Sequence, residues 1–195
     1  MNIITESQQS RNHQELINKK KNIFVIIGSA SANSANLKLV EQIVTLTTNE
    51  LNLTIYNDLK SLPHFDPELS TENPPKQIVE FRNAIEKSDG IIFCTPEYIF
   101  SIPSGLKNAI EWCISTIIFT DKPIGLITAS ASGQKGHEQL QLIMKTAMAK
   151  FTSETTLLIQ GIKGKFDERS NLTDKETQKL LGDFINAFIN LVNDK

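Results

Sequence analysis

The sequence contains little cysteine, and its cysteine pattern indicates neither a disulfide framework nor a zinc site. Only Cys94 and Cys113 occur, both inside apolar stretches, and neither belongs to a CxxC pair. Disulfide scaffolds and zinc ribbons need several cysteines at characteristic spacings. We therefore expect two reduced thiols in the core and no metal site.

The chain also lacks an excess of positive charge and a long apolar run. Its 20 basic and 22 acidic residues give a formal charge of -2 and a pI near 5.9, so no broad cationic surface should attract nucleic acid or an anionic membrane. No apolar run approaches the roughly 20 residues that cross a bilayer, and residues 1–21 are too polar for the apolar centre of a secretion signal. We expect a cytoplasmic protein that binds neither nucleic acid nor membrane.

A chain of 195 residues, 39% of them hydrophobic, is long enough for one substantial core and too short for two ordinary domains. We assign this core to a single domain, residues 22–195. Residues 1–21 are rich in Gln, Asn, Ser and Lys, with Leu16 and Ile17 as later apolar anchors, and such a segment buries too little surface to offset ordering. We expect a flexible or helical extension; an arm swapped onto a partner subunit is the alternative.

From Asn22 onward, short apolar runs alternate with longer amphipathic segments, which is typical of a parallel sheet with crossover helices on both faces. The first run is β-branched without polar alternation, as expected for a strand covered on both faces at the sheet centre. The predicted strands are 23–27, 51–56, 90–95, 123–128 and 155–159.

Five helices are predicted between and after these strands, because apolar residues recur there at helical spacing. Thr173 and Glu176 indicate a capping box at the start of the last helix, and the proline-rich segment 62–67 should be an irregular loop. The helical positions are Leu37, Val40, Ile43, Val44 and Leu46; Ile78, Val79, Phe81 and Ile85 behind Pro74 and Pro75; residues 104–116; Leu140, Ile143, Met144 and Met148; and Leu180, Leu181, Phe184, Ile185, Phe188 and Leu191.

Ligands of such sheets bind beyond the carboxyl ends of the strands, so the loops after the first, third and fourth strands should carry function. The first, 28–36, spaces Ser and Asn through small residues at a helix start, where hydroxyls, free N–H groups and the positive helix end would hold a terminal phosphate. It has neither a dinucleotide glycine fingerprint nor a P-loop lysine, so a mononucleotide fits better. The same residues could instead be only turn and N-cap residues.

The second loop is the more specific signal. Residues 95–112 read TPEYIFSIPSGLKNAIEW, and this segment resembles the NADPH-dependent FMN reductase family, whose members carry T-P-E-Y, a short Ser/Pro stretch and L-K-N-A-I-[DE]-W. The first loop is similar to that family's G-S-x-R-x-x-S-x-N motif, and residues 130–136 are similar to its S-x-G-x-x-G segment. The likeness extends over about residues 22–160 and includes 62–67.

The resemblance implies a flavodoxin-like three-layer α/β/α fold with a five-stranded parallel sheet in the order 2-1-3-4-5. It also implies an NAD(P)H-dependent oxidoreductase that passes electrons through bound FMN to quinone-like or other small acceptors, with NADPH or NADH as co-substrate; the family includes quinone, chromate and azo reductases. Because flavin N5 accepts the hydride, no protein acid or base is required. A homodimer or homotetramer is expected.

The same resemblance implies a set of cofactor-binding residues in the three loops. Glu97 and Tyr98 could contact the cofactor, a partner subunit or both. Lys135 could lie near the flavin or in solvent at a helix start. Lys107 and Trp112 are expected to have structural roles. The three histidines are expected to be surface residues; the alternative for His64 is a position over the flavin site. The implied residues are Ser29, Ser31, Ser34, Ala35 and Asn36 for the phosphate, Pro96, Glu97, Tyr98 and Ile99 for the ring, and Ser130, Ser132 and Gly133 at the ring edge.

The chain departs from the family pattern at two places. Ser31 replaces the phosphate-loop arginine, which removes a bidentate charged contact. Ile99 stands where asparagine is common, and Phe100 adds a second apolar group.

Two other classes of function stay open. One is an FMN-binding electron carrier or module without turnover; the balanced charge counts against it, because a carrier usually needs a strongly acidic docking face. The other is an interaction domain that has lost flavin. Apolar residues 114 and 117–119 could be a dimer surface or interior.

The apolar pair Ile99 and Phe100 makes a prediction about the acceptor. If these side chains surround the mouth of the site, a hydrophobic quinone should be reduced faster than chromate, a small oxyanion. Steady-state rates with each acceptor under the same NADPH concentration measure this preference. A clear preference for chromate contradicts it.

Overall fold

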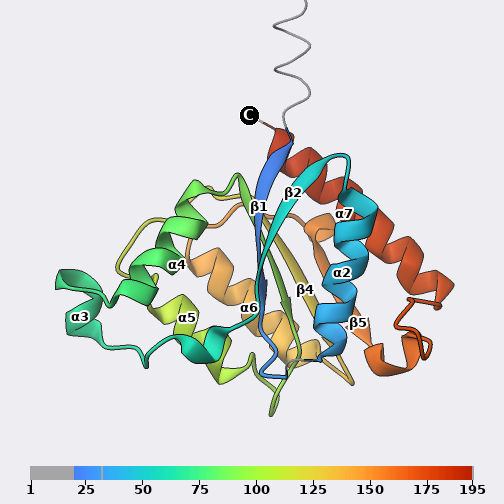
Figure 1. The fold of residues 1–195 in the computed structure, drawn as a ribbon, viewed down its shortest axis with the longest axis horizontal. Coiled ribbons are helices and arrows are strands. Elements are labelled where there is room, and N and C mark those ends of the chain that lie inside the picture. Colours follow the sequence, from blue (N-terminus) through green and yellow to red (C-terminus); the bar gives the residue numbers. More distant parts are fainter. Residues whose placement is uncertain (1–19, 32, 195) are drawn as a thin grey trace, which may run out of the picture.

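The computed structural model describes residues 20–31 and 33–194. The expected extension with Leu16 and Ile17 lies almost entirely outside these residues. Five parallel strands form one sheet in the order β2-β1-β3-β4-β5, which confirms the predicted topology (Figure 1). The strands are β1 (Lys21–Ile27), β2 (Leu51–Tyr56), β3 (Gly90–Thr95), β4 (Ile124–Ser130) and β5 (Thr156–Gln160).

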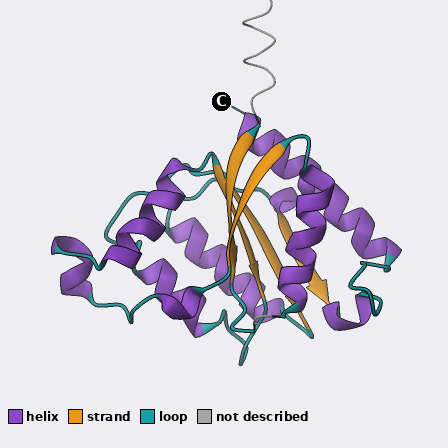
Figure 2. Cartoon of the chain, viewed as in Figure 1, coloured by secondary structure: helices purple, strands orange, loops and turns teal. Residues whose placement is uncertain are grey.

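Helices cover both faces of this sheet, which gives the three layers (Figure 2). One apolar cluster joins the sheet to α2 (Ala35–Thr47) and α7 (Lys175–Asn193). The other joins it to α4 (Lys76–Lys87), α5 (Ser104–Glu111) and α6 (Gln134–Thr146). The described chain also contains three short 3-10 turns: η1 (Leu59–Ser61), η2 (Ser153–Thr155) and η3 (Ile162–Lys165).

The central strand β1 shows why the apolar runs predict the sheet. Ile23, Val25 and Ile27 belong to the cluster under α2 and α7, whereas Phe24 and Ile26 belong to the cluster under α4, α5 and α6. Successive side chains of a strand point to opposite faces, so both faces can be covered only if every position is apolar. The uninterrupted run therefore places β1 in the middle of the sheet.

The predicted irregular loop 62–67 was correct only in part. A sixth α-helix of the described chain, α3 (Pro67–Glu72), begins at its end. The Asp66 carboxylate accepts hydrogen bonds from the backbone N–H groups of Glu68 and Leu69, and Pro67 occupies the first helical position, where its missing N–H costs nothing. Pro67 therefore begins a helix, whereas the prolines of this segment predicted an irregular loop.

Several predicted boundaries were wrong by a few residues. The helix 104–116 ends at Glu111, and the helix expected to include Met148 ends at Thr146, because Met148 has a left-handed backbone with φ of +59°. The predicted capping box is absent from α7: Asp174, not Thr173, is the N-cap and accepts the Thr177 N–H. Five of the apolar residues that indicated the predicted helices are exposed, namely Val44, Leu46, Val79, Met148 and Leu180.

The apolar segment after α5 divides between interior and surface. Phe119 is 4% exposed and packs in the core, whereas Ile117 is 80% exposed and Ile114 is also exposed. Both cysteines are buried and free; burial raises the pKa of both thiols, that of Cys113 to about 12 although Arg82 opposes the change. None of the described helices is long and apolar enough to cross a membrane.

The contact between β4 and α7 gives a test of this packing. A Cβ added at Gly125 would lie 2.7 Å from Phe184 Cζ and 3.2 Å from Phe188 Cδ2. Because the core has no room for it, Gly125→Ala should lower the free energy of unfolding by about 1–3 kcal/mol, measured by urea denaturation. The control is Gly182→Ala on α7, where a Cβ meets no atom within 4 Å and should be neutral or stabilising; equal effects would contradict the packing.

Candidate functional site

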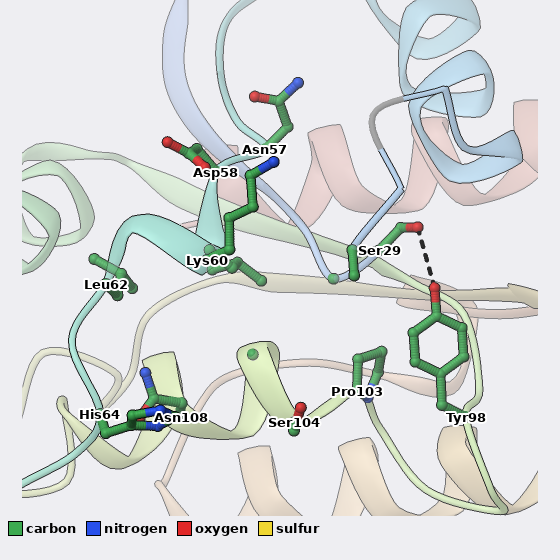
Figure 3. Close-up of a pocket in the computed structure, with 14 residues that line it drawn as sticks. Ser29, Asn57, Asp58, Lys60, Leu62, His64, Tyr98, Pro103, Ser104 and Asn108 are labelled. Atoms are coloured by element: carbon green, nitrogen blue, oxygen red, sulfur yellow. Dashed lines mark hydrogen bonds between the residues drawn. The ribbon is translucent and has the colours of Figure 1, made fainter.

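Loops from three strands meet at the carboxyl edge of the sheet. The loop after β1 approaches the β3–α5 loop where the hydroxyl oxygens of Ser29 and Tyr98 lie 3.5 Å apart (Figure 3). The β4–α6 loop approaches the same segment, because the Ser130 hydroxyl lies 3.5 Å from the Glu97 carbonyl oxygen. The structure therefore brings the three predicted loops together.

The loop after β1 presents hydroxyl groups at the start of α2. Ser34 is the N-cap: its hydroxyl oxygen accepts the Leu37 N–H at 3.1 Å. The Ser29 hydroxyl accepts the Ser31 N–H at 3.2 Å, and the Ser31 side chain is exposed. No acidic residue occupies the first turn of α2, so the positive end of the helix is not neutralised from within the turn.

Asn36 takes a different position from its neighbours. It is buried, and its side-chain amide donates to the Ala129 carbonyl oxygen at 3.1 Å. The Cys94 thiol lies 3.4 Å from Asn36 Oδ1 as a weak donor. Both ends of this amide are engaged with β3 and β4, so Asn36 ties α2 to the sheet beneath the loop. Ala35, beside it, is half-buried against the core.

The β3–α5 loop is attached to α6 by two side chains. Glu97 Oε2 accepts the Gly136 N–H at 2.7 Å. Gln139 Oε1 accepts both the Ser101 hydroxyl at 2.6 Å and the Ile102 N–H at 3.0 Å. Gly136 permits this approach, because a Cβ there would lie 3.2 Å from Glu97 Cβ. Gln139 was not predicted, and no motif in the sequence singles it out.

Between these two attachments the backbone makes a tight turn. Tyr98 and Ser101 exchange two backbone hydrogen bonds of 2.9 and 3.1 Å. Ile99 and Phe100 between them have φ of 49° and 57°, and they are 94% and 76% exposed. Turns with two left-handed residues favour Asn-Gly, and each bulky L residue there costs on the order of 1–2 kcal/mol. The attachments to α6 hold this unfavourable turn in place.

The third loop contributes a left-handed glycine and an ion pair. Gly133 has φ of 87° and is the N-cap of α6, while Ser132 is exposed and Ser130 half-buried. Lys135 lies on the surface and pairs with Glu138 at 2.8 Å, which raises the pKa of this lysine. Lys135 is thus solvated at the helix start, and its proximity to a bound flavin stays a prediction.

A cleft of about 630 Å³ lies on the α5 side of these loops. Its walls come from the loop after β1, the segment after β2 and the start of α5 (Figure 3). Of the predicted cofactor-binding residues, only Ser29 and Tyr98 line it. His64 also lines it and is exposed, as expected for a surface histidine; whether it overhangs a bound flavin stays a prediction.

The helix with the L-K-N-A-I-E-W sequence holds one wall of this cleft. Asn108 Oδ1 accepts the Phe65 N–H at 2.7 Å, and Asn108 Nδ2 donates to the Pro63 carbonyl oxygen at 2.9 Å. The Trp112 indole N–H donates to the same carbonyl at 2.8 Å. Trp112 is fully buried and Lys107 forms a surface ion pair with Glu111, so the expected structural roles of both are confirmed.

A sequence model described as NADPH-dependent FMN reductase matches residues 21–161, which include every loop described above. The chain belongs to the NADPH-dependent FMN reductase family. The predicted family is thereby confirmed. The T-P-E-Y and L-K-N-A-I-E-W motifs had indicated it.

Individual relatives of this reductase family cover most of the chain. A quinone reductase from Pseudomonas putida is 28% identical over 177 residues, which are 87% of this chain and 94% of that protein. The NADH:(hydroxy)cinnamate reductase subunit CrdA from Vibrio ruber is 26% identical over 175 residues, 86% of this chain and 85% of that one. The structure of the flavoenzyme FerB, an NAD(P)H:(acceptor) oxidoreductase from Paracoccus denitrificans, is similar with a TM-score of 0.79 and 26% identity, covering 89% and 97% of the two chains.

The residues of the first loop fit the phosphate of the family's cofactor. Ser29, Ser31 and Ser34 supply hydroxyl donors, and the first turn of α2 adds backbone N–H groups without an opposing acid. Such a terminus binds phosphate without a cationic side chain. The donor set is therefore compatible with FMN although Ser31 replaces the family arginine.

His137, in the first turn of α6, predicts an acid sensitivity of this reductase. Its Nδ1 lies 3.0 Å from the Thr128 hydroxyl, and burial lowers its pKa, with Glu138 acting in the opposite direction. As the pH falls, the His137 imidazole becomes protonated near pH 6.5 in the unfolded state but only at a lower pH in the folded state. The free energy of unfolding should therefore fall as the pH decreases below about 6.5.

Urea denaturation of the wild type and of His137→Gln between pH 8 and pH 5 measures this contribution. The variant should lose less stability over that interval, because it has no imidazole to protonate. Both proteins are compared at pH 8 first, where the histidine is neutral in either state. Parallel curves from pH 8 to pH 5 contradict the assignment.

Proposed function

We propose that this chain is a cytoplasmic NAD(P)H-dependent reductase that binds FMN and reduces quinone-like acceptors. The observation that supports this best is the meeting of the hydroxyl-bearing loop at the start of α2 with the fixed β3–α5 loop. One offers donors for a phosphate, and the other offers a rigid edge for a flat ring.

In this proposal Ser29, Ser31 and Ser34 bind the phosphate of FMN with the N–H groups of α2. The ring packs along Pro96, Glu97 and Tyr98, whose backbone is fixed by α6. The remaining proposed contacts are Ala35, Asn36, Ile99, Ser130, Ser132 and Gly133. FMN held there would supply the hydride and electron transfer between NAD(P)H and the acceptor. The protein would bind and orient the cofactor and the acceptor and shield them from water. No side chain needs to exchange a proton with the hydride donor.

The acceptor assignment follows the apolar turn and the relatives. Ile99 and Phe100 expose apolar side chains next to the proposed ring site, and relatives such as the Pseudomonas putida protein are named quinone reductases. In the net reaction NAD(P)H loses two electrons and one proton, and the quinone gains two electrons and two protons to become a hydroquinone. The second proton comes from solvent.

The proposal includes a homodimer or homotetramer. Ile114 and Ile117 expose apolar side chains beyond the end of α5, and Ile99, Phe100 and Tyr98 do so at the opposite edge of the sheet. Apolar side chains that would otherwise face water are typical of the centre of subunit contacts.

Ser34 allows phosphate binding to be separated from helix capping. Ser34→Asp keeps an N-cap side chain but places a carboxylate beside the phosphate, so FMN affinity should fall by about tenfold or more, since a like charge within ~4 Å costs a few kcal/mol. Ser34→Ala removes the cap, so it should cost about 1 kcal/mol of stability and only a few-fold in affinity. Calorimetric FMN titration and urea denaturation measure the two effects.

Activity is then tested with the wild type. NAD(P)H oxidation that depends on added quinone supports a reductase, whereas FMN binding without turnover supports the carrier or binding module. If correctly folded protein takes up no FMN, both readings fail and the loop residues serve only as turn and cap residues.

A further inference from the structure

The cleft on the α5 side is not explained by the proposed FMN contacts. Only Ser29 and Tyr98 belong both to those contacts and to the walls of this cleft. The cleft volume of about 630 Å³ lies in the range of small-molecule sites, roughly 300–1,000 Å³. It therefore offers space for a second molecule beside the proposed flavin site.

The walls of the cleft are apolar on two opposite sides. Figure 3 shows Leu62 on one side and Pro103 with Tyr98 on the other. Lys60 lies above this space and Ser104 below it in the same view. Apolar walls with a few polar groups at the ends are typical of sites for flat ring systems that carry oxygen or nitrogen atoms at their edges.

The charge of the cleft favours a neutral ligand over a small anion. Lys60 brings a positive charge, but Asp58 lines the same cleft and brings a negative one. The salt bridges and hydrogen bonds found among residues 20–31 and 33–194 involve neither the Lys60 ammonium nor the Ser104 hydroxyl. Both remain able to donate hydrogen bonds to carbonyl oxygens.

The wall that carries His64 is rigid. Both of its neighbours are fixed to α5, Phe65 through its N–H and Pro63 through its carbonyl oxygen, by the side chains of Asn108 and Trp112. His64 is therefore presented at the cleft from a fixed backbone. A site whose walls are fixed in advance loses less entropy when a ligand binds.

We propose that this cleft binds the electron acceptor, a neutral quinone of one or two fused rings, between Leu62 and Pro103. Lys60 and Ser104 donate hydrogen bonds to its oxygen atoms. The assignment rests on the proposed reductase function, and it selects the cleft, not the outer apolar turn at Ile99 and Phe100, as the place that determines acceptor size.

Gly105 gives the sharpest test, because it lines the cleft and a Cβ there would make only an ordinary contact of 3.6 Å with Leu59 Cβ. Gly105→Ala should fold normally, and Gly105→Leu should fill much of the space. We expect Gly105→Leu to raise the KM for 2-methyl-1,4-naphthoquinone by about tenfold or more, the smaller 1,4-benzoquinone to be affected less, and Gly105→Ala to be intermediate. The control is Gly182→Ala on α7.

Lys60→Met tests the hydrogen bond separately, since it keeps the apolar stem of the side chain. Loss of one donor should raise the quinone KM by about 2- to 10-fold. Lys87→Met, at the end of α4 on the opposite edge of the sheet, is the matched control. Neither Lys60→Met nor Gly105→Ala should change FMN affinity by more than about twofold.

The outcomes separate this inference from the proposed function. A wild type without FMN binding or NADPH oxidation ends the reductase proposal itself. An active wild type whose Gly105→Leu variant keeps its FMN and its quinone KM overturns the inference alone. A rise in the KM for NADPH instead of the quinone KM also overturns it, because the cleft then binds the nicotinamide nucleotide. If Gly105→Leu fails to fold, Gly105→Ala and Lys60→Met decide.

Discussion

The attachment of the β3–α5 loop to α6 is the constraint on which the geometry of the carboxyl edge depends. Glu97 and Gln139 supply hydrogen bonds on either side of a turn whose two central residues oppose their own backbone conformation. Within the turn itself, only the two backbone hydrogen bonds between Tyr98 and Ser101 oppose this backbone cost. With the hydrogen bonds to α6, Pro96 to Tyr98 form a fixed edge against which the loops after β1 and β4 are placed.

The fold could be predicted from the sequence because a parallel sheet covered on both faces leaves a simple pattern. The β1 run contains no polar position, and its residues divide between two cores. The helix ends could not be predicted as closely, because a turn such as the one at Met148 depends on contacts distant in sequence. The start of α3 at Pro67 was not predicted, because proline can end one helix and begin another.

The candidate site could be predicted only as three loops. Short motifs identified them and their family, since their residue types recur at fixed spacing. The sequence did not indicate that Asn36 points beneath its loop to Ala129, or that Gln139 fixes the neighbouring loop. Both facts depend on the meeting of segments about 40 or more residues apart. The cleft beside α5 could not be predicted for the same reason, because its walls come from three separate segments.

The left-handed pair Ile99 and Phe100 also has a consequence for the order in which the molecule opens. A segment that stores unfavourable backbone energy and exposes its side chains needs little free energy to detach locally, compared with the central strands. The amide hydrogens of Tyr98 and Ser101 should exchange with solvent long before those of β1 and β3. A flat ligand seated against this loop would then slow that exchange, so occupancy of the site becomes visible as protection of one short turn.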